Sequence, residues 1–516
     1  MPYKREIANR STHGTVVEDP RINEQLREFH YATPPSRAVN LSIAKRFMRP
    51  PPSRGEPSHL NVVAVDGSNY CATIDASLPQ TELSFTKIGT LRLNGQEYND
   101  LNDMQLVDPY AVAALETGYD SFSYVLPGAN VRTATLTNPD EALRYAMNEA
   151  FNVTIGADGR QLMDTFFYLA SRRSGSLKNH DPSWIWIDEC AACGSGPISI
   201  GRLSKRSICQ SCGSAVYPVD ALKLWQEDDD IRSIATVTNR VMMTIEHLLL
   251  VHNVRHLYLD SPEVLGNTAF IVDGPLAIFG WGCKWIHAPI METLHNIALD
   301  LESRGLGAPV IFGVQKNGYM TDHAETVSPL VTANRLFAVD DQYRYTDVNG
   351  APSSARTKYG FGSVTHYGQD FIFKSPSDRI YVLSVPYPFS SKESVSQFQA
   401  AKLQVPRYKT MGTVLSLISR FECDLFENSL SPMVLAHRYT SISAAAGGGV
   451  LDELAATSIT PANPGLRSPH LPVPQPTSIS EPPALAGTSS TGGPALPPKN
   501  LINGAPNIRP KRWKVL

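Results

Sequence analysis

LNVVAVDG, at residues 60–67, is a run of apolar and β-branched residues that stops at an Asp-Gly pair. A second run of the same kind, TAFIVDGPLAIFG at residues 268–280, meets another Asp-Gly pair. Such runs predict buried β-strands that are followed by turns. Because both strands end in Asp-Gly, we expect Asp66 and Asp273 to come together at one edge of a single sheet.

Other segments predict the elements that surround these two strands. The segment 229–252 is the clearest helix, because its apolar residues recur every three or four positions. The run at 60–67 and two following strands are expected to form an antiparallel meander. The pattern as a whole predicts an α/β fold with a mixed sheet flanked by helices. The further strands are expected at 69–75, 83–93, 309–314, 370–374 and 379–385, and the further helices at 139–151, 160–171 and 290–304.

Composition limits the class of protein. The chain has 516 residues, of which 42% are hydrophobic, so it can bury a substantial core. Its formal net charge is −3, and this lacks the basic excess that many DNA-binding proteins carry. If the chain binds a nucleic acid, the positive charge that contacts the phosphates must therefore be confined to a local patch, or come from a bound metal or a partner protein. The N-terminus has no secretory pattern and no apolar run is long enough to cross a bilayer, so we expect a soluble cytoplasmic protein.

The amino-acid composition changes near both ends of the chain. Residues 1–57 are polar and proline-rich near their end, and we expect an N-terminal extension. Residues 58–440 form the expected main domain. Residues 441–508 are rich in Pro, Ser, Ala and Gly and predict a disordered linker. The last eight residues, RPKRWKVL at 509–516, form either a docking peptide on this tether or a solubilising basic tail.

Three carboxylates stand in apolar surroundings. Asp66 and Asp273 follow buried strands, and Glu246 lies on or beside the apolar stripe of the 229–252 helix. A carboxylate in such a place is costly unless it is solvated, paired or bound to metal, and Mg²⁺ and Mn²⁺ prefer oxygen ligands. Two plainer interpretations stay open, since Asp-Gly is a common turn and Glu246 could reach solvent. Glu263, in LDSPEV, is a weaker alternative ligand on an expected loop.

The order of these motifs resembles the NurA nuclease family. The resemblance rests on the strand VAVDGS, a helix that carries Glu246, the strand IVDGPL, the strand and turn VIFGVQKNG, and a late LAH. It spans roughly residues 59–440, with insertions. One departure concerns a Tyr that the family has in a Gly-Tyr-Pro context shortly before its C-terminal His. This chain reads ENSLSPMVLAH there and has no Tyr.

The resemblance implies a ribonuclease-H-like core and a DNA nuclease that uses Mn²⁺ or Mg²⁺. It implies that Asp66, Glu246 and Asp273 are the metal-binding carboxylates. Lys316 matches a basic position near the site and would steady the scissile phosphate as a point charge. His437 matches the C-terminal histidine and would bind a second metal or position the attacking water. Each of these last two residues could also be an ordinary surface residue with no part in catalysis.

Four of the seven cysteines form a metal-ligand pattern. CAAC at 190–193 and CQSC at 209–212 are separated by fifteen residues, and this is a spacing of structural zinc sites. We expect Cys190, Cys193, Cys209 and Cys212 to bind Zn²⁺ in a zinc ribbon inserted at residues 185–218. The insert carries three basic residues between the cysteine pairs, so it could touch DNA or a partner. The odd number of cysteines argues against a secreted disulfide framework.

Three functions remain as hypotheses. The first is a metal-dependent DNA nuclease, which by resemblance would form a homodimer and work with a HerA-like hexameric ATPase in DNA repair or in defence against foreign DNA. The second is a catalytically inactive scaffold or DNA-binding adaptor of such a complex. The third is a zinc-ribbon nucleic-acid adaptor, which leaves the acidic residues unexplained. Trp281 and Trp285 are expected to be core residues rather than platforms for base stacking.

Overall fold

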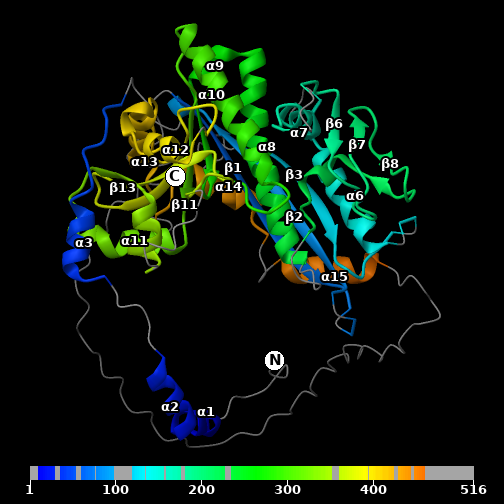
Figure 1. Ribbon diagram of the computed structural model, residues 1–516, viewed down its shortest axis with the longest axis horizontal. Helices are drawn as coiled ribbons and strands as arrows, with labels where there is room; N and C mark the ends of the chain where they lie inside the picture. Colours follow the sequence, from blue (N-terminus) through cyan, green and yellow to red (C-terminus); the bar gives the residue numbers. More distant parts are fainter. Residues whose placement is uncertain are drawn as a thin grey trace, which may run out of the picture.

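A computed structural model describes most of the chain (Figure 1). The described residues are 10–29, 35–53, 60–75, 77–78, 80–97, 119–133, 135–136, 138–155, 159–175, 180–226, 234–350, 360–392, 394–423, 428–442 and 447–459. The expected basic peptide at 509–516, and the linker beyond residue 459, lie outside these residues.

An eight-stranded mixed sheet organises the described residues, in the order β12-β13-β14-β11-β10-β1-β2-β3. Strand β1 pairs in parallel with β10, which pairs in parallel with β11, and the other neighbours are antiparallel. The mixed α/β fold class is therefore as expected. The strands of this sheet are β1 (Asn61–Thr73), β2 (Glu82–Leu93), β3 (Tyr119–Pro127), β10 (Thr268–Asp273), β11 (Val310–Gln315), β12 (Arg335–Ala338), β13 (Gly368–Lys374) and β14 (Ile380–Pro386).

Helices cover both faces of the sheet. Alternate residues of β1 point to opposite faces and therefore pack in two different hydrophobic cores. Val63 and Val65 pack with α6 (Pro139–Phe151), α7 (Leu162–Ala170), α8 (Ile234–Asp260) and α10 (His287–Ser303). Val62 and Ala64 pack with α13 (Met411–Phe421) and α14 (Ser431–Thr440) on the opposite face. The remaining helices are α1 (Arg10–Glu18), α2 (Pro20–Glu28), α3 (Arg37–Ala44), α9 (Pro262–Gly266), α11 (Tyr319–Val327), α12 (Val395–Ala401) and α15 (Gly448–Ser458).

The longest helix, α8, crosses one face of the sheet (Figure 1). By length and composition it could span a membrane, although 67% of its most apolar window is buried inside the protein. The buried part includes Val237, Val241, Ile245 and Leu248, which recur at helical spacing. This burial is that of a core helix packed on a sheet.

Both ends of the main domain extend beyond the expected limits. In the expected N-terminal extension, Ile43 and Phe47 pack in a core with Phe337 and Tyr343. In the expected linker, α15 lies against β1, and the Tyr70 hydroxyl donates a hydrogen bond of 2.9 Å to Asp452. These contacts join distant parts of the chain, so local composition does not reveal them.

Two details of the sequence interpretation are wrong. β1 does not stop at Asp66 but continues to Thr73, because β2 pairs with it along this whole length. The meander therefore consists of β1, β2 and β3, and its third strand is Tyr119–Pro127. Trp281 is not a core residue, since 78% of its surface is exposed. Trp285 is partly buried and donates a hydrogen bond of 2.9 Å to the carbonyl of Ala221.

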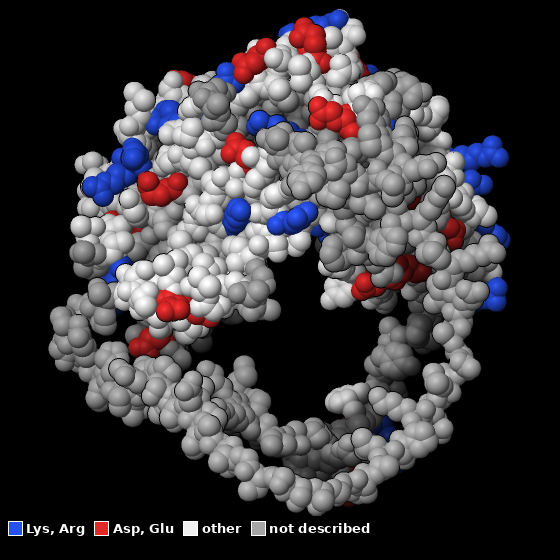
Figure 2. Space-filling view, turned by 180° about the vertical axis from the view of Figure 1, so that it is seen from behind, with Lys and Arg blue, Asp and Glu red and all other residues white. Residues whose placement is uncertain are grey.

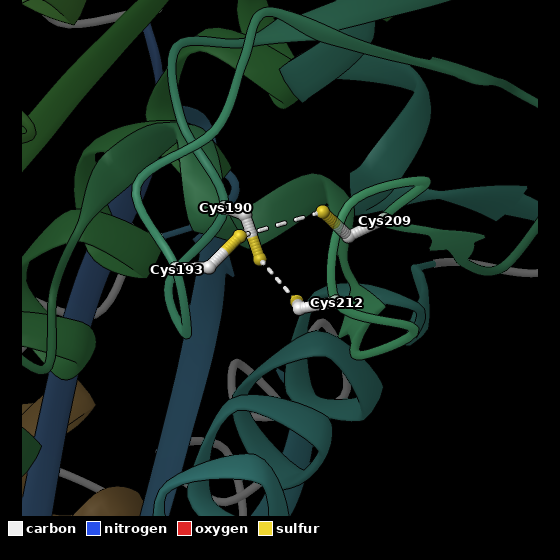
Figure 3. Close-up of side chains that lie close together, drawn as sticks. All are labelled: Cys190, Cys193, Cys209 and Cys212. Carbon is white, nitrogen blue, oxygen red and sulfur yellow. Dashed lines mark hydrogen bonds between the residues drawn. The ribbon is translucent and has the colours of Figure 1, made fainter.

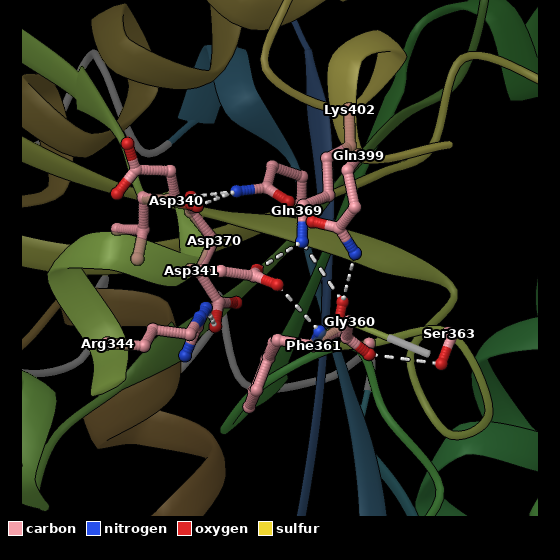
Figure 4. Close-up of polar contacts among 12 residues, drawn as sticks. Asp340, Asp341, Arg344, Gly360, Phe361, Ser363, Gln369, Asp370, Gln399 and Lys402 are labelled. Carbon is pink, nitrogen blue, oxygen red and sulfur yellow. Dashed lines mark hydrogen bonds and ion pairs between the residues drawn. The ribbon is translucent and has the colours of Figure 1, made fainter. Parts of the chain in front are cut away.

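A buried polar cluster lies in the other half of the sheet (Figure 4). Asp370 on β13 accepts hydrogen bonds from Arg344 and from the Ser384 hydroxyl, and all three side chains are buried. Lys402 donates to Asp341 at 2.9 Å and to the carbonyl of Phe361 at 3.0 Å. Because each buried charge faces an opposite charge, we assign this cluster a structural role.

Candidate active site

Asp66 and Asp273 lie at the same edge of the parallel part of the sheet. The parallel register of β1 and β10 ends with Val65 opposite Val272. Asp66 directly follows Val65 and Asp273 directly follows Val272, so the two aspartates occupy equivalent positions on neighbouring strands. Among the described strands, only antiparallel β2 pairs with β1 from Asp66 onward. The structure therefore brings the two predicted aspartates together.

Helix α14 supplies the contacts of Asp66. The Asp66 side chain points to the face that α14 covers, and only 1% of the residue is exposed. Its Oδ2 lies 3.0 Å from Nδ1 of His437 and accepts a 2.7 Å hydrogen bond from the Thr440 hydroxyl. The hydrogen bond with Asp66 raises the pKa of His437 above its usual value, and half of the His437 side chain stays exposed. The predicted His437 thus lies beside a predicted carboxylate.

Lys316 follows β11 and pairs with Asp273. Its Nζ lies 2.9 Å from Asp273 Oδ2. Burial raises the pKa of Asp273, the charge and hydrogen bond of Lys316 oppose this rise, and the charge of Asp66 adds to it. Gly274 adopts a φ of +85°, a conformation that favours glycine, and turns the chain away directly after the carboxylate. Lys316 is therefore not merely a solvated turn lysine.

Glu246 approaches from the opposite layer, on α8. It is 7% exposed, so it does not reach solvent from the edge of the helix stripe. A Cβ on Gly67 would lie only 2.8 Å from its Oε1, so the missing side chain makes room for this carboxylate. Burial raises the pKa of Glu246 well above its usual value, and the charges of Asp66 and Asp273 raise it further. Glu246 therefore interacts electrostatically with both Asp66 and Asp273.

Three further residues beside Asp66 were not predicted. Thr440 lies one helical turn after His437 in LAHRYT, and that spacing was the available signal. Lys87 on β2 is opposite Ser68 and lies over the ring of Tyr119, with its Nζ 5.7 Å from the ring centroid. The Tyr119 side chain covers Gly89, the residue opposite Asp66 in the register, and no local pattern places it there.

Glu263 does not belong to this group. It is exposed on α9, which precedes β10, whereas Asp273 ends that strand. At about 3.3 Å per residue, the length of β10 separates the two carboxylates by well over 10 Å. The alternative ligand is therefore excluded from this site.

The donor chemistry of the site fits a hard divalent cation. Asp66, Glu246 and Asp273 offer carboxylate oxygens, which hard cations prefer. Burial is the main cause of the raised pKa values of Glu246 and Asp273, and the neighbouring carboxylate charges add to the rise, which a bound cation would oppose. Among the described residues, only the cysteine cluster has three or more His, Cys, Asp or Glu ligand atoms that all lie within 4.8 Å of one another. The oxygens of Asp66, Glu246 and Asp273 are therefore not gathered as closely as the sulfur atoms of that cluster.

The four predicted cysteines form a second candidate metal site (Figure 3). Their ligand atoms all lie within 4.8 Å of one another. The Cys190–Cys212 and Cys193–Cys209 sulfur separations are both 3.7 Å. A tetrahedral zinc with Zn–S bonds of about 2.3 Å requires sulfur separations of about 3.8 Å. The arrangement can thus hold a metal ion such as zinc.

Two matching turns build this cluster. The backbone N–H of Gly194 donates to the carbonyl of Cys190, and that of Gly213 donates to the carbonyl of Cys209, each at 2.9 Å. Both glycines adopt a positive φ, which explains why glycine follows each cysteine pair. The cluster joins short hairpins formed by β6 (Trp184–Ile187), β7 (Ile198–Gly201), β8 (Ser207–Ile208) and β9 (Ala215–Val216).

Comparisons with known proteins add little. No protein-family model and no curated protein matches this chain. The crystal structure of the NurA nuclease from Sulfolobus solfataricus is similar at 11% identity and a TM-score of 0.29, over 87% of this chain and 97% of that one. Because this likeness is slight, the function has to be argued from the site.

Proposed function

We propose that this chain is a divalent-metal-dependent DNA nuclease that hydrolyses phosphodiester bonds. The observation that supports this most is the approach of Asp66, Asp273 and Glu246 where the parallel pairing of β1 with β10 ends. Two layers of the fold supply these carboxylates, and Asp66 and Glu246 are buried whereas Asp273 is partly exposed. Glu246 in particular is buried beside two like charges, and such an arrangement is costly unless a cation offsets it.

Asp66, Glu246, Asp273 and His437 would hold Mn²⁺ or Mg²⁺. When bound, such ions lower the pKa of water and stabilise a leaving oxygen. They also make an acidic site attractive to phosphate, which accounts for DNA binding by a chain without a basic excess. Among the described residues on the face in Figure 2, Lys and Arg are scattered between Asp and Glu and form no continuous basic surface.

Other side chains of the site would handle the substrate. Lys316 and Lys87 lie on the two sides of the aspartate pair and offer positive charge to a phosphodiester. Thr440 and His437 hold the Asp66 carboxylate in one orientation. The half-exposed imidazole of His437 can position the attacking water or accept its proton.

The proposal also includes partners of the nuclease. By the resemblance to the NurA family, we expect a homodimer that acts on DNA together with a HerA-like hexameric ATPase. Repair and defence against foreign DNA are both compatible settings. The cysteine cluster would hold structural Zn²⁺, since protein sulfur atoms fill all four positions.

A non-catalytic adaptor is the competing function. Two observations favour it, namely the absence of the family Tyr before His437 and the absence, among the described residues, of three carboxylate or His ligand atoms gathered within 4.8 Å. Such an adaptor would bind DNA or the ATPase without cleaving.

Cleavage of labelled DNA tests the proposal. We expect the full chain to cut single- or double-stranded DNA with Mn²⁺ or Mg²⁺, and not without divalent cations. Each reaction is run with and without a HerA-type ATPase, because a partner could be required. Absence of cleavage in every combination, with DNA or ATPase binding retained, would establish the adaptor instead.

Gly67→Ala tests whether the approach of Glu246 matters. The new Cβ would lie 2.8 Å from Oε1 of Glu246 and 3.0 Å from Cγ of Met242, so the flexible carboxylate moves while the backbone stays. A shift of about 1 Å in a catalytic group costs up to about 100-fold in rate, and we expect a loss of about 10- to 100-fold. Gly449→Ala, where nothing lies within 4 Å of the new Cβ, is the control. Equal cleavage rates in both variants would contradict a role for this approach.

A further inference from the structure

A second basic site lies between the cysteine-bearing insert and helices α7 and α8. A cavity of about 710 Å³ opens there, and it is lined by Arg160, Tyr168, Arg202, Leu203, Arg255 and His256 among others. Figure 1 shows α7 and strands β6 and β7 on the same side of α8. Neither the candidate active site nor the cysteine cluster includes any of these residues.

Two of the arginines have carboxylate partners. Arg160 pairs with Asp260 at 2.5 Å, and Arg202 pairs with Asp164 at 2.5 Å. Arg202 also donates to the side-chain oxygen of Gln161 at 2.8 Å. These ion pairs hold the two side chains in the cavity wall. Because the carboxylates neutralise Arg160 and Arg202, these two arginines offer little positive charge to a ligand.

Two further arginines have no such partner. The guanidinium carbon of Arg172 lies 4.0 Å from the centroid of the Tyr168 ring, and that of Arg255 lies 4.2 Å from it. Within the described part of the chain, neither guanidinium has an ion pair or a hydrogen bond to a side chain. Burial lowers the pKa of Arg255, the neighbouring Tyr168 and Asp164 oppose this fall, and the charges of Arg172 and Arg160 add to it. Two half-buried like charges thus lie on one ring, while Asp164 in the cavity wall forms its ion pair with Arg202.

This arrangement has the chemistry of a phosphate site. Stacking on one aromatic ring holds both guanidinium planes and leaves their N–H edges available for bidentate hydrogen bonds. Phosphate oxygens fit such forks and would supply the missing negative charge. Leu203, 99% exposed at the rim, offers an apolar contact to a base or sugar.

The site is separate from the carboxylates. Arg255 follows Glu246 by nine residues on α8, which is about 14 Å along the helix and half a turn around it. A strand held by Arg172 and Arg255 would therefore run along the outside of α8. A flexible single strand can follow a concave basic groove of this kind, whereas a rigid duplex presents a convex surface to it.

We propose that this groove binds the phosphate backbone of single-stranded nucleic acid. Its main contacts would be Arg255, which lines the cavity, and Arg172, which lies beside the cavity on the same Tyr168 ring. The choice of nucleic acid as the ligand rests on the proposed function, whereas the presence of an anion site does not. The cysteine-bearing insert thereby gains a role, because its Gly201–Ser204 turn forms one wall of the groove.

Binding of a labelled single-stranded oligonucleotide tests this inference. The full chain carries Asp66→Asn to prevent cleavage, and no chelator is added, since it would extract an ion from the cysteine cluster. We expect Arg172→Ala with Arg255→Ala to weaken binding by about ten-fold and to reduce the slope of log K against log salt by about 1.4, for two lost phosphate contacts. The double Lys variant keeps the charge and should keep most of the slope. Arg335→Ala, at the far edge of the sheet on β12, is the matched control.

The outcomes separate this inference from the proposed function. Unchanged affinity and slope in the double Ala variant would overturn the groove, even if the wild type cleaves DNA. A weakened double variant of a chain that never cleaves would support the groove and leave the nuclease rejected. Polyglutamate is the competitor that tests an acidic protein as the ligand. Competition by polyglutamate as strong as that by the oligonucleotide would reassign the groove to such a partner.

Discussion

Asp66→Asn and Asp273→Asn each reduce metal-dependent DNA cleavage by at least about 100-fold. The expected loss follows from the removal of one charged cation ligand, which weakens both cation binding and charge stabilisation in the transition state. Asparagine has nearly the same shape, so the fold should survive. Initial cleavage rates at saturating Mn²⁺ measure the effect. Asp378→Asn is the control, because this exposed aspartate lies in the turn between β13 and β14 and, among the described residues, forms its ion pair with Lys374.

Thermal unfolding gives the same variants a readout besides activity. A cation that binds only the folded protein raises Tm, and the rise grows with the logarithm of the ratio of cation concentration to Kd. We therefore expect Mn²⁺ to raise the Tm of the wild type and of Asp378→Asn, and to raise that of the two site variants much less. Variants that cleave like wild type, or that gain the same Tm shift from Mn²⁺, would refute a cation site at these carboxylates.

Cys209→Ser should remove one bound zinc per chain and destabilise the insert. Structural zinc contributes on the order of 10 kcal/mol to folding of small zinc domains, so loss of one sulfur ligand is severe. The damage should spread, because Ile185, Ile200 and Val216 of the insert belong to the same core as α7 and α8. Zinc content by elemental analysis and Tm by calorimetry measure the two effects.

The control for this prediction is Cys71→Ser. Cys71 lies on β1 outside the cluster, with its sulfur 3.5 Å from the Ser84 hydroxyl. It should keep its zinc and lose little stability. A Cys209→Ser protein that is as stable as Cys71→Ser, and wild-type protein purified without zinc, would together show that the cluster holds no structural ion.

Much of the candidate site could be predicted because its signals are local. An apolar run that meets Asp-Gly marks a carboxylate next to buried strand residues, and two such runs in neighbouring parallel strands place their carboxylates side by side in the sheet. The spacing of the cysteine pairs likewise follows from the geometry of a turn that offers two sulfur atoms. Helix α8 was predictable from its period, although residues 229–233 of the expected helix lie outside the described part of the chain.

The sequence by itself therefore determined the α/β class, the convergence of Asp66 with Asp273, and the cysteine cluster. Only the tertiary structure decided that β1 continues past Asp66, since this depends on pairing with β2. It also decided that Glu246 reaches over Gly67 from the other layer, and that Arg172 and Arg255 share the ring of Tyr168. The reason is physical: a local pattern fixes which face of a strand or helix is apolar, whereas the register and packing of distant segments fix which polar side chains meet.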